Sequence, residues 1–224
     1  MESLTSLYEL TNSWERPRGV RLVENFTGNE LNTNRWNTVL NGSGGAIAPS
    51  DTVDGGLEIK SATNNSSIID FAITDTNKVS PFNNHGFVQI AVVKLTDIQY
   101  GIIRFGMKDN FWSSVGSYVR VQLYGDQNSL GGSQENKISL NSDNFSVINT
   151  DITDSSSPSM YDWLTHRVES TSTTTTLAIN GILKVTGSGV PDAKLMPYME
   201  VSNSEGTAST NPIGNIRYME CYNT

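Results

Sequence analysis

Short runs of strand-forming residues recur along almost the whole chain, and clusters of Gly, Asn, Asp and Pro separate them. Such runs predict β-strands joined by turns. Residues 118–124 show the pattern most clearly, because Val119, Val121 and Leu123 would face one side of a sheet and the polar residues between them the other. The expected strands cover residues 20–26, 57–61, 67–73, 86–95, 101–107, 116–124, 136–140, 163–170, 174–180, 182–186, 195–202 and 214–222.

The composition supports an all-β chain. Ser, Thr and Asn number 27, 22 and 23 of the 224 residues, and their side chains compete for backbone hydrogen bonds inside a helix. About a dozen strands exceed what an immunoglobulin-like domain of roughly 100 residues holds. We therefore expect a larger antiparallel β-sandwich of two sheets, a jelly roll.

The chain is expected to form one sandwich domain over residues 21–224, preceded by an arm over residues 1–20 that shows no strand alternation. Asn180-Gly181 lies between two strand-like runs, which is a strong signal for a two-residue type I′ hairpin. A second, weaker hairpin signal lies at residues 41–45.

Charge and hydropathy exclude several classes of function. The formal net charge is −8, and Lys and Arg form no cluster, so nucleic acid is not an expected ligand. No apolar run is long enough to span a bilayer, and residues 1–20 lack the basic and then apolar pattern of a signal peptide. Cys221 is the single cysteine, which excludes an internal disulfide and predicts a packed thiol.

Two groups of motifs resemble the concanavalin A-like lectin and glucanase superfamily, in its laminin-G-like and laminarinase-like members. The first is Glu24-Asn25-Phe26-x-Gly28-x-x-Leu31 with Trp36, followed by Gly55-Gly56-Leu57-x-Ile59. The second is Trp163-x-x-His166-x-Val168, followed by Leu177-x-Ile179-Asn180-Gly181. The resemblance spans residues 22–222 and implies a jelly-roll sandwich with Trp36 and Trp163 in its core. It does not assign an activity, because such sandwiches include lectins, glycoside hydrolases, lyases and adhesive modules.

The resemblance also implies where catalytic residues would lie. Glucanases of this superfamily carry a Glu-x-Asp-x-Glu or Glu-x-Asp-x-x-Glu strand, but no Glu-x-Asp occurs in this chain. We therefore expect no glucanase activity. A polysaccharide lyase could use a Tyr or His base with an Arg or Gln opposite a uronate carboxylate. Those residue types occur at Tyr118, Arg120, Gln122, Tyr124 and His166. An ordinary solvated sheet face and a hydrogen-bonded histidine explain the same residues better.

Sugar-binding proteins combine aromatic faces with planar polar side chains. The candidate ligand-binding residues are Trp112, Tyr118, Arg120, Gln122, Tyr124 and Tyr198. The tyrosines would alternatively only cover a sheet, and Trp112 would cap the core. No cofactor is expected apart from a structural calcium ion, for which Glu24, Asp151 and Asp154 are candidate ligands, although ordinary exposed acids explain these residues better.

These features predict a non-catalytic module for surface binding or assembly, on the surface of a virus or phage particle or in another extracellular setting. Its expected partners are other protein subunits, further copies of itself or surface glycans. The alternatives are a free carbohydrate-binding lectin, a glycoside hydrolase and a polysaccharide lyase. Trp36→Ala is expected to cost several kcal/mol, whereas Trp112→Ala is expected to reduce binding and leave stability nearly intact.

Overall fold

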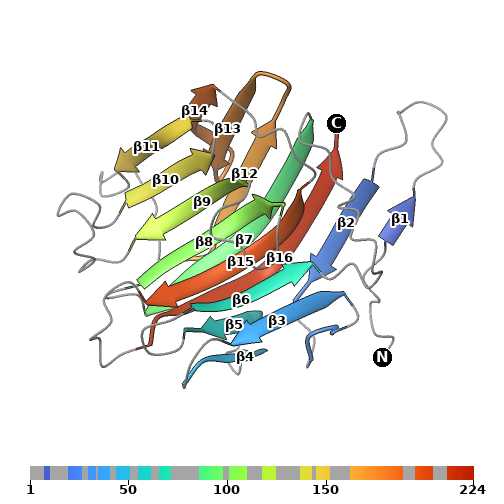
Figure 1. Ribbon diagram of the computed structural model, residues 1–224, viewed down its shortest axis with the longest axis vertical. Coiled ribbons are helices and arrows are strands. Elements are labelled where there is room, and N and C mark those ends of the chain that lie inside the picture. The colour runs from blue at the N-terminus through green and yellow to red at the C-terminus, as the bar shows by residue number, and fades with distance from the viewer. Residues whose placement is uncertain are drawn as a thin grey trace.

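The computed structural model forms two antiparallel sheets that pack face to face (Figure 1). The sequence therefore predicted the fold class correctly. The structure describes residues 8–10, 20–26, 30–33, 35–40, 44–50, 55–61, 66–71, 86–97, 101–109, 118–124, 137–142, 145–151, 162–188, 195–203 and 211–224. These residues contain no helix, and thus none that could span a membrane.

The first sheet, sheet A, lies behind the other in Figure 1 and has the order β1-β2-β16-β7-β12-β13-β14, with β5 pairing with β16 and β4 with β5. Its strands are β1 (Tyr8–Leu10), β2 (Val20–Asn25), β4 (Ala46–Pro49), β5 (Leu57–Lys60), β7 (Phe87–Asp97), β12 (Leu164–Ser170), β13 (Thr174–Ile179), β14 (Ile182–Ser188) and β16 (Ile213–Asn223).

The second sheet, sheet B, has the order β11-β10-β9-β8-β15-β6-β3 and forms the front layer of Figure 1. Its strands are β3 (Trp36–Leu40), β6 (Ser66–Phe71), β8 (Gly101–Lys108), β9 (Tyr118–Tyr124), β10 (Lys137–Ser142), β11 (Phe145–Asp151) and β15 (Met196–Asn203).

The core lies between the two sheets and follows the alternation read from the sequence. Val119, Val121 and Leu123 of β9 are all buried in it. Trp36 is also buried, as the motif implied, and its ring centroid lies 5.3 Å from that of Phe26. Cys221 is buried too, and burial raises the pKa of its thiol. Removal of these apolar side chains from water supplies the main force that holds the sheets together.

The two hairpin expectations have different outcomes. Asn180 and Gly181 connect β13 to β14 with φ values of 49° and 81°, as a type I′ turn requires. The hairpin expected at residues 41–45 is wrong, because β3 before it belongs to sheet B and β4 after it to sheet A. The chain crosses between the layers there.

The expected arm contains one strand, and the expected position of Trp163 needs correction. Residues 8–10 of the expected arm form β1, which pairs with β2 at one edge of sheet A. Trp163 lies outside the core cluster and is partly exposed. Its ring lies 4.5 Å from the Arg217 guanidinium and 5.8 Å from the Lys94 ammonium. A Cβ atom added at Gly56 would lie 3.0 Å from the Ile216 carbonyl oxygen and 3.1 Å from this ring, and the φ of 104° also favours glycine there.

Candidate functional site

The outer face of sheet B is the surface of β8, β9, β10 and β15 that points away from sheet A. Antiparallel register brings its side chains into rows across the strands. One row contains Glu200, Arg104, Gln122 and Ser139. The next contains Tyr198, Gly106, Arg120 and Asn141.

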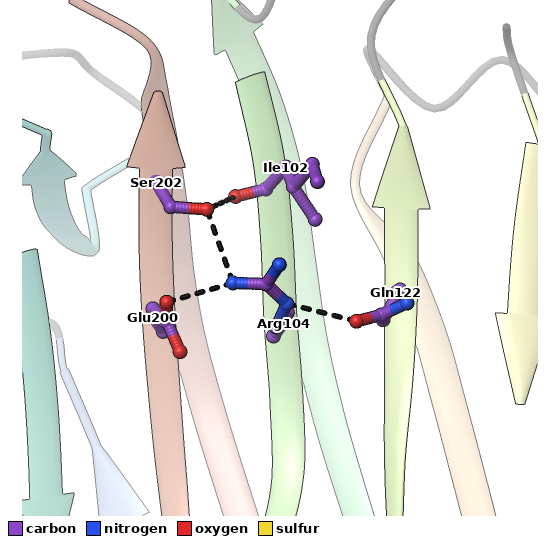
Figure 2. Close-up of polar contacts among 5 residues, drawn as sticks. All are labelled: Ile102, Arg104, Gln122, Glu200 and Ser202. Carbon is purple, nitrogen blue, oxygen red and sulfur yellow. Dashed lines mark hydrogen bonds and ion pairs between the residues drawn. The ribbon is translucent and has the colours of Figure 1, made fainter. Parts of the chain in front are cut away.

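Arg104 is the centre of the first row (Figure 2). Its Nε donates to Gln122 Oε1 at 2.8 Å, and its Nη1 donates to Glu200 Oε1 at 2.7 Å and to Ser202 Oγ at 3.2 Å. The Ser202 hydroxyl in turn donates to the Ile102 carbonyl at 3.4 Å. The side chains of Arg104 and Glu200 are 21% and 18% exposed, so this network is ordered by its contacts and still reaches solvent.

Gly106 determines the shape of the second row. A Cβ atom at this position would lie 2.2 Å from the Val119 carbonyl oxygen and 2.7 Å from Arg120 Cα. Both distances are too short for any residue with a side chain. Because Gly106 has no side chain, Tyr198 and Arg120 meet across β8. The Arg120 guanidinium also lies 4.1 Å from the centroid of the Tyr118 ring, and the Lys108 ammonium lies 4.6 Å from that of Tyr198.

Most polar side chains of this face are more buried than the sequence suggested. Gln122 and Tyr198 are 5% and 2% exposed, so the expectation of a fully wet face is wrong for both. Burial raises the pKa of the Tyr198 hydroxyl, and the positive charge of Arg120 opposes this effect without cancelling it. Tyr198 is therefore a neutral hydroxyl at physiological pH, able to donate a hydrogen bond.

The structure brings four of the six predicted ligand-binding residues onto this one face: Tyr118, Arg120, Gln122 and Tyr198. Tyr124 ends β9, and its side chain is not described. Trp112 lies outside the described residues. Sequence reasoning missed Arg104, Lys108 and Glu200 as members of the same site, although the alternation of β8 and β15 could have placed them there.

His166, considered as the base of a lyase, does not reach this face. Its side chain lies in the core, with its ring centroid 4.9 Å from that of Phe105. Burial lowers the pKa of His166 to about 4, and its contact with the Leu164 backbone opposes the shift. A neutral imidazole between the two sheets cannot contact a polysaccharide on the surface.

The three candidate calcium ligands do not meet at a described site. The buried carboxylate of Glu24 accepts a hydrogen bond from Trp36 Nε1 at 3.1 Å. Asp151 ends β11 with its side chain not described, and Asp154 lies outside the described residues. Within the described part of the chain, no three His, Cys, Asp or Glu residues gather as a metal site would require. Calcium binding therefore remains a prediction from the sequence.

No protein-family model matches the chain, and no curated protein matches it in sequence. Solved structures do match. A family 16 endo-glucanase from Bacteroides ovatus has a TM-score of 0.62 at 10% identity, with 89% of this chain and 99% of that chain covered. An endo-β-1,3-glucanase from Pyrococcus furiosus has a TM-score of 0.63 at 13% identity, with 90% and 92% covered.

A family 7 alginate lyase, solved with a product bound, has a TM-score of 0.58 at 11% identity, covering 85% of this chain and 96% of that one. Identities this low show the fold alone, and fold alone does not assign an activity. The motifs of the sequence and these structural matches agree, and the chain has the concanavalin A-like jelly-roll fold.

Proposed function

We propose that this protein recognises a polysaccharide through the outer face of sheet B and does not cleave it. The observation that carries the proposal is the Arg104 network, which holds a guanidinium, an amide, a carboxylate and a hydroxyl in fixed positions on one surface. Planar polar groups of this kind satisfy sugar hydroxyls, and Tyr118 supplies an aromatic ring beside them. Polysaccharide-active enzymes with the same fold make a carbohydrate ligand a reasonable first choice.

The non-catalytic part of the proposal rests on the carboxylates. Hydrolysis of a glycosidic bond commonly uses two carboxyl groups on either side of the bond. Among the outward positions of β8, β9 and β15, Glu200 is the one carboxylate, and it is ion-paired with Arg104 at 2.7 Å. A carboxylate in this pair is better suited to holding the arginine than to transferring a proton.

Retention on immobilised polysaccharides, with Arg104→Met compared with Arg167→Met, tests this proposal. Arg167 is a matched control, because it contacts Glu169 at 2.8 Å on sheet A instead of sheet B. We expect Arg104→Met to weaken retention at least tenfold and Arg167→Met to leave it unchanged. Equal effects of the two variants, or no retention of the wild-type protein by any polysaccharide, would contradict the binding proposal.

The same polysaccharides, incubated with the protein and assayed for new reducing ends and unsaturated sugars, test the non-catalytic part. We expect neither product. Reducing ends without unsaturation would indicate a glycoside hydrolase, and unsaturated ends would indicate a lyase. The non-catalytic proposal would be overturned if the wild-type protein formed either product and the Glu200→Gln or Tyr198→Phe variant did not.

We further propose that this recognition takes place on the surface of a particle such as a virion. The support is compositional: the chain is acidic and rich in Ser, Thr and Asn. Light scattering on untagged material from its source, with and without residues 1–20, tests this placement. Incorporation into a large assembly that depends on residues 1–20 is the expected result. A monomer in both cases, with a mass of 24.5 kDa for the full chain, would contradict it.

A further inference from the structure

The outer face of sheet B differs in charge from the protein as a whole. The chain has a formal net charge of −8. The outward positions of β8, β9 and β15 nevertheless carry three basic residues, Arg104, Lys108 and Arg120, and a single acidic residue, Glu200. A local excess of positive charge on an acidic protein attracts anions to that surface.

The charges of the two rows are balanced differently. Glu200 neutralises Arg104 directly, with an N–O distance of 2.7 Å. In the part of the chain that the structure describes, no carboxylate forms an ion pair with Arg120. Asp70 lies in the same row as Arg120, but three strand spacings away, or about 14 Å. Arg120 is thus a cation of this face that Glu200 does not neutralise.

The surroundings of Arg120 hold its guanidinium in place without satisfying it. The group lies over the Tyr118 ring at 4.1 Å and interacts with the Tyr198 hydroxyl. Its Nε is buried and has no hydrogen-bond partner. An arginine held by an aromatic ring keeps its donors available for a planar anionic group.

We propose that the polysaccharide bound on this face is anionic, and that Arg120 binds its acidic group, with Lys108 adding positive charge beside it. This inference rests on the proposed function of the face. Two oxygen anions would supply the same chemistry, the carboxylate of a uronic acid and a sulfate ester. The guanidinium fork matches a planar carboxylate with two parallel hydrogen bonds, and we assign the uronate as the ligand.

The decisive measurement compares natural uronate polysaccharides of plant, algal, bacterial and animal origin with their carboxyl-reduced forms, which keep each linkage and lose the charge. We expect the wild-type protein to bind at least one natural polysaccharide tenfold or more tightly than its reduced form. We also expect this preference to shrink as salt is added. A sulfated, uronate-free galactan forms a second arm, and tight binding to it alone would overturn the carboxylate assignment.

Variants of Arg120 locate the preference. Arg120→Gln should abolish the preference for the natural polysaccharide over its reduced form, and Arg120→Lys should retain part of the preference. Arg167→Gln on sheet A is the control and should change neither. A preference that survives Arg120→Gln in a folded protein would overturn the role of Arg120.

The two proposals fail in distinguishable ways. Binding that is equal for natural and reduced polysaccharides, or confined to neutral ones, would overturn the anionic ligand and leave glycan recognition standing. Absence of binding to every polysaccharide in both forms would overturn the proposed function itself.

Discussion

The Gln89 side chain of β7 donates a hydrogen bond to the backbone carbonyl of Gly106 on β8, with an N–O distance of 3.1 Å. The bond crosses the core and joins the two sheets directly beneath the outer face of sheet B. Gly106 is the residue over which Tyr198 and Arg120 meet. The geometry of the candidate site is thus linked to a polar residue buried in the opposite sheet.

Replacement of Gln89 by Met tests this link. Met has a similar volume but donates no hydrogen bond, so the Gly106 carbonyl would lose a buried partner. We expect a loss of about 1 kcal/mol in the free energy of unfolding, measured by urea denaturation. The loss is moderated because Gln89 Oε1 is itself buried without a partner in the wild-type protein. An unchanged or increased stability would show that the bond contributes nothing.

Gly106→Ala tests the close approach of β8 and β9. The added methyl group would meet backbone atoms of Val119 and Arg120, which cannot rotate away. We expect a loss of several kcal/mol, beyond the range of about 1–3 kcal/mol typical of overpacking.

Gly55→Ala is the matched control for this test. Gly55 has a φ of 66°, and a Cβ atom there would have no neighbour within 4 Å. It should therefore show only the cost of backbone strain, about 1 kcal/mol. Similar losses for both variants would mean that the contact between β8 and β9 relaxes easily.

The sequence predicted the parts of the fold that follow from local periodicity. Alternation in residues 118–124 correctly separated the core face from the outer face of β9, and Asn180-Gly181 correctly identified a hairpin. Local patterns failed for β3 and β11, whose Asn, Thr and Ser residues resemble a loop. Those strands are defined by pairing with β6 and β10, and such partners cannot be read from one short segment.

The candidate site shows the same division. Alternation placed Tyr118, Arg120 and Gln122 on one face, because they lie on a single strand. The partners of Arg104 are 18 to 98 residues away along the chain, and only the register of β8, β9 and β15 brings them together. The burial of Tyr198 likewise depends on neighbours from other segments, so alternation alone wrongly predicted an exposed ring.

Stability is expected to fall in mild acid because of His166. Its pKa is about 4 in the folded protein, below the ordinary value of 6.5, so the unfolded chain binds a proton first as pH decreases. The stabilisation is complete above pH 6.5 and is lost as pH falls toward 4, by about 3 kcal/mol in total. Urea denaturation at intervals between pH 7 and pH 5 measures the first part of this loss, before most carboxylates titrate.

His166→Leu provides the control, since the other histidine, His85, remains in both proteins. The variant should show a nearly flat stability between pH 7 and pH 5. If the variant and the wild-type protein lose stability in parallel, another group causes the acid sensitivity.

Trp36 is expected to stabilise the sandwich in two separable ways. Trp36→Ala removes a side chain that is 1% exposed and should cost about 3–5 kcal/mol. Trp36→Phe keeps much of the packing but removes the indole donor to the buried carboxylate of Glu24. We expect this second variant to cost about 1–3 kcal/mol, because one hydrogen bond to a buried acceptor is lost. Thermal or urea unfolding of both variants checks the order, and a Trp36→Phe variant as stable as the wild-type protein would contradict the role of the indole nitrogen.

The ion pair between Arg104 and Glu200 should be coupled more strongly than that between Arg167 and Glu169. The N–O distances are nearly equal, at 2.7 and 2.8 Å, but the side chains of the second pair are 42% and 39% exposed, about twice the values of the first. Solvent screens the exposed pair, so its coupling energy should stay below about 0.5 kcal/mol. The partly buried pair should reach about 1–2 kcal/mol, because its hydrogen bonds involve charged groups less accessible to water.

Double-mutant cycles with each residue changed to Ala, measured by urea denaturation, give both coupling energies. Equal coupling in the two pairs would mean that solvent screens the Arg104 network as it screens any surface ion pair. That result would argue against a preorganised site on the outer face of sheet B.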